Sequence, residues 1–179
     1  MKLEEKIVEY AKKKNNSWHK PQIGIYHASR IYDICTGKLK PKDFFKERDL
    51  TDRTLVIFEI GNMYHNYVQQ VIYPNEIQEY PVQIEDDGWK IVGRVDLIVN
   101  GNIIDLKTVS NLPTEPKIDH IYQLNVYLEA LNKPYGYITY IEKNPIAFNT
   151  VDFKVKRDKK LIKEIKEKVG LFHKELCQI

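Results

Sequence analysis

Apolar positions along this 179-residue chain repeat with two different periods. A spacing of three to four residues predicts helices over 3–14, 55–72, 117–132 and 158–176, and a shorter helix over 27–36 with Ser29 as its cap. A spacing of two residues predicts strands over 77–84, 89–99, 102–109, 135–142 and 150–156. This order of elements predicts the α/β class, with a mixed central β-sheet flanked by helices.

Turn and breaker residues separate these segments. Pro74 and Pro134 follow two of the predicted helices, and Asn100-Gly101 joins two predicted strands as a two-residue hairpin turn. The helix over 55–72 is predicted to bury one apolar face, formed by Ile60, Tyr64, Tyr67, Val68, Val71 and Ile72. The C-terminal helix is predicted to bury a stripe formed by Leu161, Ile165, Val169, Phe172 and Leu176. Without internal repeats or low-complexity linkers, residues 1–179 are interpreted as a single domain.

The composition excludes several classes of protein. With 42% hydrophobic and 30% charged residues, the chain is typical of a soluble globular protein. No apolar run approaches the roughly 20 residues that span a bilayer, and the N-terminus lacks the apolar core of a secretory signal. Cys35 and Cys177 are too few for a disulfide framework and lack the spacing of a zinc site. These features predict an intracellular, cytoplasmic protein without a membrane partner.

The net charge of +3 is unevenly distributed. Residues 154–168 hold eight basic and three acidic side chains, so the rest of the chain carries a slight negative excess. A lysine-rich amphipathic helix is usually a solvated face, but this one, over about 158–176, could also contact phosphates. Both interpretations stay open.

Chemistry is suggested by the predicted hairpin. Asp105 and Lys107 are two residues apart, so they share one face of their strand. A two-residue turn would pair Val99 with Asn102 and place Asp96 directly across from Asp105. Two facing carboxylates repel each other unless a cation lies between them, and a hard divalent cation suits oxygen ligands. A surface hairpin with solvated charges explains the same residues, and the hairpin alone does not decide between the two.

Four motifs in order make a more specific pattern. The motifs, which span residues 61–127, are Gly61-Asn62-Met63-Tyr64-His65, Gly93-Arg94-Val95-Asp96, Ile104-Asp105-Leu106-Lys107-Thr108 and Gln123-Leu124-Asn125-Val126-Tyr127. Together they resemble the PD-(D/E)XK nuclease superfamily and its RecB-like branch, which includes the nuclease domains of recombination helicase-nucleases and the CRISPR-associated nuclease of spacer acquisition. The segment from Ser29 to Cys35 resembles an N-terminal element of the family more weakly.

The resemblance implies a restriction-endonuclease-like core and a site for Mg²⁺ or Mn²⁺. His65, Asp96, Asp105 and the carbonyl of Leu106 would be the metal ligands. The resemblance implies catalytic roles for Asp96, Asp105, Lys107, Gln123 and Tyr127. Lys107 would lie near the attacking water, while Gln123 and Tyr127 would face the site from one side of a helix.

Other residues carry weaker expectations. Glu79 is either an additional acid of the site or a solvated strand end, and Arg30 is either a phosphate contact or an ordinary surface residue. Many members of the branch hold an iron–sulfur cluster with four cysteines. Two thiolates cannot complete that site, so no cluster is expected, and His173 is not favoured as a substitute ligand beside Cys177.

The resemblance therefore implies a metal-dependent DNA nuclease, and the family favours an exonuclease that acts on single-stranded ends. The alternative is a nucleic-acid-binding or assembly protein that keeps the fold without cutting. The substrate would be DNA, as a single strand or as duplex ends. Self-association, a helicase or processing partner, a viral origin, and a role in repair, CRISPR adaptation or viral genome processing all stay open.

Overall fold

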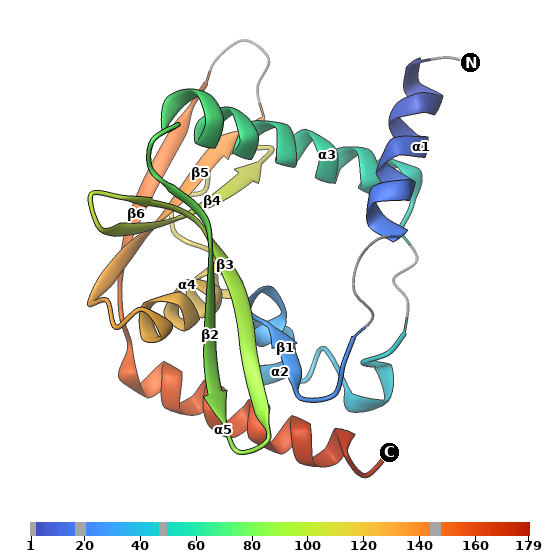
Figure 1. Ribbon diagram of the computed structural model, residues 1–179, viewed down its shortest axis with the longest axis vertical. Coiled ribbons are helices and arrows are strands. Elements are labelled where there is room, and N and C mark those ends of the chain that lie inside the picture. The colour runs from blue at the N-terminus through green and yellow to red at the C-terminus, as the bar shows by residue number, and fades with distance from the viewer. Residues whose placement is uncertain (1–2, 17–20, 47–49, 144–147) are drawn as a thin grey trace.

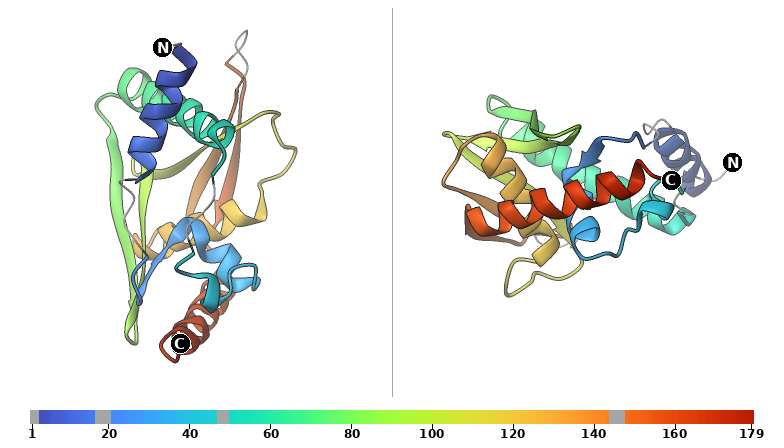
Figure 2. Two further views of the ribbon diagram at one scale, coloured as in Figure 1. Left: turned by 90° about the vertical axis from the view of Figure 1, so that its right-hand side faces the viewer. Right: turned by 90° about the horizontal axis from the view of Figure 1, so that it is seen from below.

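The computed structural model describes residues 3–16, 21–46, 50–143 and 148–179. Within these residues, six strands form one mixed sheet with helices on its two faces, as expected from the sequence (Figures 1 and 2). The strands are β1 (Ile25–His27), β2 (Ile77–Asp86), β3 (Trp89–Val99), β4 (Asn102–Val109), β5 (Tyr135–Glu142) and β6 (Thr150–Lys156). The helices are α1 (Leu3–Asn16), α2 (Ile31–Cys35), α3 (Asp52–Tyr67), α4 (Ile118–Ala130) and α5 (Lys159–Leu176).

The sheet is built around β3, which has different partners along its two edges. One edge pairs with β2 over nearly the whole strand. The other edge pairs with β1 at residues 90–92 and with β4 at residues 97–99. Residues 93–96 therefore lie in a gap between β1 and β4. Beyond β4 the order continues through β5, which is parallel to β4, to the antiparallel strand β6.

The hairpin between β3 and β4 has the predicted turn. Val99 pairs with Asn102, and Asn100 and Gly101 both have positive φ, at 50° and 77°, as a two-residue turn of type I′ requires. The ladder ends at Leu97–Ile104, however, one pair short of the expected Asp96–Asp105 pair. The expected direct pairing is therefore wrong: the strands separate here, and the backbone N–H of Leu106 bonds the carboxylate of Asp96.

Two apolar clusters hold the helices against the sheet. The larger one lies on the side covered by α2, α4 and α5 and includes Leu124, Leu128, Ile138, Ile165 and Val169. The smaller one lies under α3 and consists of Val68, Leu97, Leu106 and Ile141, with Tyr64 packed against it. Figure 1 shows α3 and α5 at opposite ends of the molecule, with β2 and β3 running between them.

The α5 stripe is buried much as predicted. Ile165, Val169, Phe172 and Leu176 are at most 6% exposed, and the partly buried Leu161 packs beside them. Asp158 caps the helix by accepting hydrogen bonds from the backbone N–H groups of Lys160 and Leu161.

The apolar face predicted for 55–72 is largely wrong. Ile60, Tyr67, Val71 and Ile72 are between 38% and 59% exposed. The α-helix begins at Asp52, where Thr51 caps it, and residues Val68–Ile72 continue as a π-helical turn. Only Leu55 and Val68 of its apolar residues are buried, and a side of the helix that includes Gly61 and His65 borders a cavity.

The predicted helix over 27–36 also differs from the structure. It is divided into the end of β1, a 3₁₀ turn over Ala28–Arg30 and α2, and Ser29 caps neither helix. The parallel pairing of β1 with β3 takes the first of these residues into the sheet. No helix within the described ranges is long and apolar enough to cross a membrane.

Candidate active site

A cavity of about 1440 Å³ opens beside the gap in the sheet. α1 and α3 form one wall, β2 and β3 form another, and β4 and α4 close the inner end. His65, Glu79, Arg94, Lys107, Gln123 and Tyr127 are among the residues that line it. His65 and Tyr127, which are 62 positions apart in the sequence, therefore meet at the same cavity.

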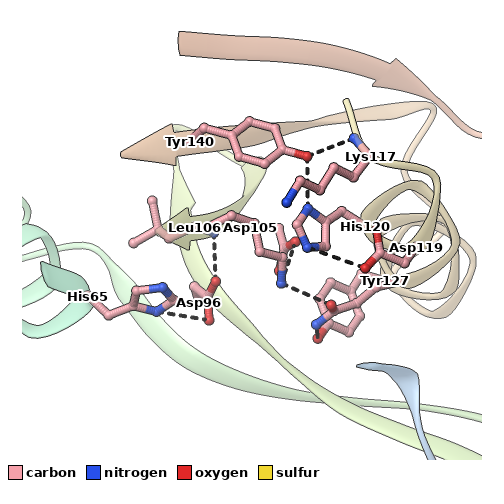
Figure 3. Close-up of polar contacts among 11 residues, drawn as sticks. His65, Asp96, Asp105, Leu106, Lys117, Asp119, His120, Tyr127 and Tyr140 are labelled. Atoms are coloured by element: carbon pink, nitrogen blue, oxygen red, sulfur yellow. Dashed lines mark hydrogen bonds and ion pairs between the residues drawn. The ribbon is translucent and has the colours of Figure 1, made fainter. Parts of the chain in front are cut away.

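The first carboxylate of the site belongs to Asp96, in the gap of the sheet. Its Oδ2 accepts a hydrogen bond from the backbone N–H of Leu106 at 2.6 Å. His65 approaches from α3, with its Nδ1 3.8 Å from the Asp96 Oδ1 (Figure 3). β3 and β4 and the helix above them thus converge on one half-buried carboxylate.

The second carboxylate belongs to Asp105, which is fully buried on β4. Lys107 lies on the same face of the strand, as predicted, with its Nζ 3.0 Å from Asp105 Oδ2 and 3.3 Å from Oδ1. Asp105 Oδ2 accepts no well-directed hydrogen bond from any residue that the structure describes. This buried oxygen therefore keeps a free coordination direction.

A chain of hydrogen bonds connects Lys107 to α4. The Lys107 Nζ donates to Gln123 Oε1 at 2.9 Å, and Gln123 Nε2 donates to the Tyr127 hydroxyl at 2.6 Å. Gln123 and Tyr127 are four residues apart and so share a helix face. Tyr127 is only 2% exposed, so this series of hydrogen bonds ends in the protein interior. It holds the Lys107 ammonium group in place from the side of α4.

Burial and neighbouring charges set the protonation of the site. Burial and the negative charge of Asp105 raise the pKa of Asp96 well above its usual value. Burial lowers the pKa of His65, and the positive charge of Lys107 lowers it further, so the imidazole is neutral at pH 7. Burial opposes the charge on Lys107, but Asp105 and Asp96 outweigh burial and raise the pKa of Lys107.

The donor types suit a divalent cation held mainly by oxygen. A buried and a half-buried carboxylate lie close together, the buried one with an oxygen that lacks a well-directed hydrogen bond, and a neutral imidazole lies beside them. Within the described residues, no three His, Cys, Asp or Glu side chains form a metal-binding cluster on their own. Waters, the Leu106 carbonyl or a substrate oxygen would have to complete the coordination.

Two motif glycines are explained by close contacts. A Cβ atom on Gly93 would lie 2.6 Å from Tyr127 Cε1 and 3.1 Å from Ala28 Cβ. A Cβ atom on Gly61 would lie 2.9 Å from Thr108 Oγ1. The absence of a side chain therefore lets α3 approach β4 and lets Tyr127 approach β3.

A profile of the PD-(D/E)XK nuclease superfamily matches residues 39–176, which is most of the chain. The chain belongs to this superfamily. Nucleases of the superfamily generally use divalent metal ions, and the class of substrate is nucleic acid. The search of curated proteins found no match.

Solved structures share the fold of this superfamily member. The crystal structure of SSO0001 is 17% identical, with a TM-score of 0.72 over 96% of this chain and 87% of that one. LHK-Exo in complex with dAMP is 17% identical, with a TM-score of 0.62 over 90% and 92%. The alkaline exonuclease LHK-Exo from Laribacter hongkongensis is 18% identical, with a TM-score of 0.55 over 86% and 88%. They confirm the restriction-endonuclease-like core.

Gln69 near the site was not found from the sequence. It is 3% exposed, and its Nε2 donates to the backbone carbonyl of Asp96 at 2.7 Å and to Glu79 Oε1 at 2.9 Å. Glu79 itself lines the cavity and has a positive φ of 49°. Gln69 lies in the π-helical turn, and no sequence motif marks such a turn.

His120 is a second residue that the motifs did not include. Its Nδ1 lies 2.8 Å from the Tyr140 hydroxyl, which accepts a hydrogen bond from the backbone N–H of Lys117 (Figure 3). Burial lowers the pKa of His120 to about 4, and the charge of Lys107 contributes. A helical spacing of three from Gln123 could have indicated that it faces the site.

Of the remaining candidates, only the residues around Ser29 reach the cavity. His27, Ala28 and Ser29 line the cavity, but Arg30 does not. Burial and Glu164 raise the pKa of Cys35 to about 12, whereas the Sγ of the exposed Cys177 lies 3.6 Å from Nε2 of His173. The absence of an iron–sulfur cluster stays a prediction.

Proposed function

We propose that the protein is a divalent-metal-dependent deoxyribonuclease that removes nucleotides from single-stranded DNA ends. The observation that carries the proposal is the position of Asp105 and Lys107. A fully buried carboxylate with an oxygen that accepts no hydrogen bond lies 3.0 Å from a lysine that lines the cavity. A solvated surface hairpin would not bury this pair, because burial of charge is costly without a compensating role.

His65, Asp96, Asp105 and the carbonyl of Leu106 would hold Mg²⁺ or Mn²⁺. The ion, when bound, supplies a water of lowered pKa and positive charge beside the phosphate. Burial and the charge of Asp105 raise the pKa of Asp96, and a bound cation would offset both effects. Neutral His65 is in the protonation state in which an imidazole can act as a ligand.

Lys107 would hold its proton and orient the attacking water against the phosphodiester. Its ammonium group is kept charged by Asp105 and Asp96, and Gln123 fixes the direction in which it points. Tyr127 would act by holding Gln123 in place, because its hydroxyl accepts the Gln123 amide N–H inside the protein. Positioning of this kind contributes to phosphoryl transfer, in which placement and electrostatics do most of the work.

The choice of single-stranded ends rests on the enclosure of the site. The cavity is bounded by helices on one side and by strands on the other, and its volume suits a few nucleotides rather than a length of duplex. The exonuclease structures with the same fold, one of them in complex with dAMP, support an exonuclease. The same proposal includes DNA, and not RNA, as the substrate and the cytoplasm as the location of the protein.

The test is cleavage of end-labelled single-stranded, duplex and circular DNA with Mg²⁺, Mn²⁺ or EDTA. We expect metal-dependent release of short products from linear single strands, and loss of activity in Asp105→Asn and Lys107→Met variants that remain folded. Met63→Ala is the matched control, because Met63 is 68% exposed on α3 and does not line the cavity. Activity in EDTA would contradict the mechanism. Metal-independent DNA binding without cleavage would favour the non-cleaving alternative.

A further inference from the structure

The wall of the cavity contains an aromatic ring that the proposed chemistry does not use. Phe58 lies on α3, lines the cavity and is 44% exposed. None of the pairs of packed aromatic rings among the described residues includes Phe58. A large apolar side chain in this position loses the stabilisation that burial would give, which amounts to about 2 kcal/mol for a phenylalanine.

The same helix face connects Phe58 to the reaction centre. Phe58, Gly61, Asn62 and His65 follow the spacing of one helix side, and all four line the cavity. Seven residues separate Phe58 from His65, which places the ring about 10 Å along the helix axis. A stacked strand advances about 3.4 Å per nucleotide, so this distance corresponds to about three nucleotides, or fewer when the strand is extended.

The walls beside Phe58 carry basic side chains. Arg94 lies on β3, two residues before Asp96 and so on the same strand face, and Lys14 and Lys143 line the cavity from α1 and the end of β5. Lys14 also forms an ion pair with Glu59 at 3.1 Å. Aromatic rings next to a basic groove are the combination that binds unpaired bases, because stacking tolerates any base and the cations attract the backbone.

We infer that Phe58 is a stacking platform for an unpaired base two or three nucleotides from the cleaved bond. A single strand would run from the Asp96–Asp105 centre along the cavity-lining side of α3, with its phosphates toward β3 and one base on the Phe58 ring. The inference rests on the proposed nuclease function and specifies its substrate: a base within a duplex has no free face to offer the ring.

The experiment combines protein variants with single abasic sites. Wild type, Phe58→Ala, Phe58→Trp and the Met63→Ala control are tested for binding to a fluorescent single-stranded oligonucleotide in EDTA. Abasic sites are placed at successive positions from the end of the strand. We expect Phe58→Ala to weaken binding about 5- to 150-fold, Phe58→Trp to retain it, and Met63→Ala to leave it unchanged. Removal of one particular base should weaken binding to wild type but should have no further effect on Phe58→Ala.

The cleavage assay gives the second measurement. With metal present, Phe58→Ala should raise KM for single strands by a similar factor and leave kcat within about twofold, because the ring lies away from the reacting phosphate. Equal affinities of Phe58→Ala and Met63→Ala, or an abasic profile that is identical in wild type and Phe58→Ala, would overturn the inference. A protein that shows the Phe58-dependent profile in EDTA but does not cut with metal would overturn the nuclease proposal alone.

Discussion

Replacement of Gly93 by alanine tests whether the close packing of Tyr127 on β3 is as tight as the structure shows. The added Cβ would lie 2.6 Å from Tyr127 Cε1, 3.1 Å from Ala28 Cβ and 3.3 Å from the Tyr127 hydroxyl oxygen. The Tyr127 ring has little room to move, because it is 2% exposed and its hydroxyl is bound to Gln123 at 2.6 Å.

The expected loss follows from two opposing contributions. Overpacking of a well-packed interior costs about 1–3 kcal/mol. The lower conformational entropy of the unfolded chain with alanine returns about 0.4–1 kcal/mol. The Gly93→Ala variant should therefore have a free energy of unfolding about 1–2 kcal/mol below that of wild type, which corresponds to a fall in Tm of about 2–8 °C for a chain of this size.

Urea unfolding followed by circular dichroism measures this loss. The matched control is Gly170→Ala in α5, where the new Cβ would lie at an ordinary 3.6 Å from Trp89 Nε1. Because glycine weakens a helix interior, this control should be more stable than wild type by about 0.5–1 kcal/mol. In a Tyr127→Ala background, which removes the ring, most of the cost of Gly93→Ala should disappear, because only the 3.1 Å approach to Ala28 Cβ remains. A neutral Gly93→Ala, or an undiminished cost without the ring, would refute the packing argument.

Three further predictions concern the site. The folded pKa of His120, about 4, lies below its unfolded value of about 6.5, so stability should fall by at most about 3 kcal/mol as the pH drops through that window. The His120→Gln variant should lack this part of the pH dependence in urea titrations, and an identical dependence in both proteins would count against it. Asp96→Asn should be more stable than wild type without metal by about 0.5–2 kcal/mol in urea titrations, while losing activity, because it removes a carboxyl group whose ionisation is opposed by burial and by Asp105; a less stable variant would contradict this. Gln123→Leu should lower kcat about 10-fold or more, because the charged Lys107 ammonium loses its hydrogen bond to Gln123 Oε1, and Tyr127→Phe should lower kcat less. Equal kcat values for Gln123→Leu and wild type would exclude the positioning role.

Local sequence patterns predicted the elements that depend on local interactions. The strands over 89–99, 102–109, 135–142 and 150–156 have the predicted bounds, because alternation and turn residues define a strand without reference to distant segments. Alternation also placed Asp105 and Lys107 on one face, and their ion pair follows from that. The motif order indicated which residues would meet, although periodicity alone could not have done so.

Long-range packing explains what the sequence did not show. β1 is three residues long and exists through its parallel pairing with β3, which lies more than 60 positions away. The apolar residues of α3 suggested a wider buried face, but this segment packs on the sheet through Tyr64 and Val68 and leaves Ile60 and Tyr67 exposed. The hydrogen bond from the Leu106 N–H to the Asp96 carboxylate depends on where β3 and β4 separate. The turn predicts the register of the pairing but not the residue at which the pairing ends.

The two-residue turn at Asn100-Gly101 sets the alternation of β4 for its whole length. Asp105 and Lys107 face α4 together with Ile103, while Leu106 faces α3. A single inserted residue in the turn would exchange these faces, so that the leucine would face α4 and the acid and the lysine would face α3. Length changes are therefore far more damaging in this turn than in the loop over 110–117, whose residues lie outside any strand ladder. Natural or designed variation in this protein should accumulate in that loop, and the hairpin should keep its length.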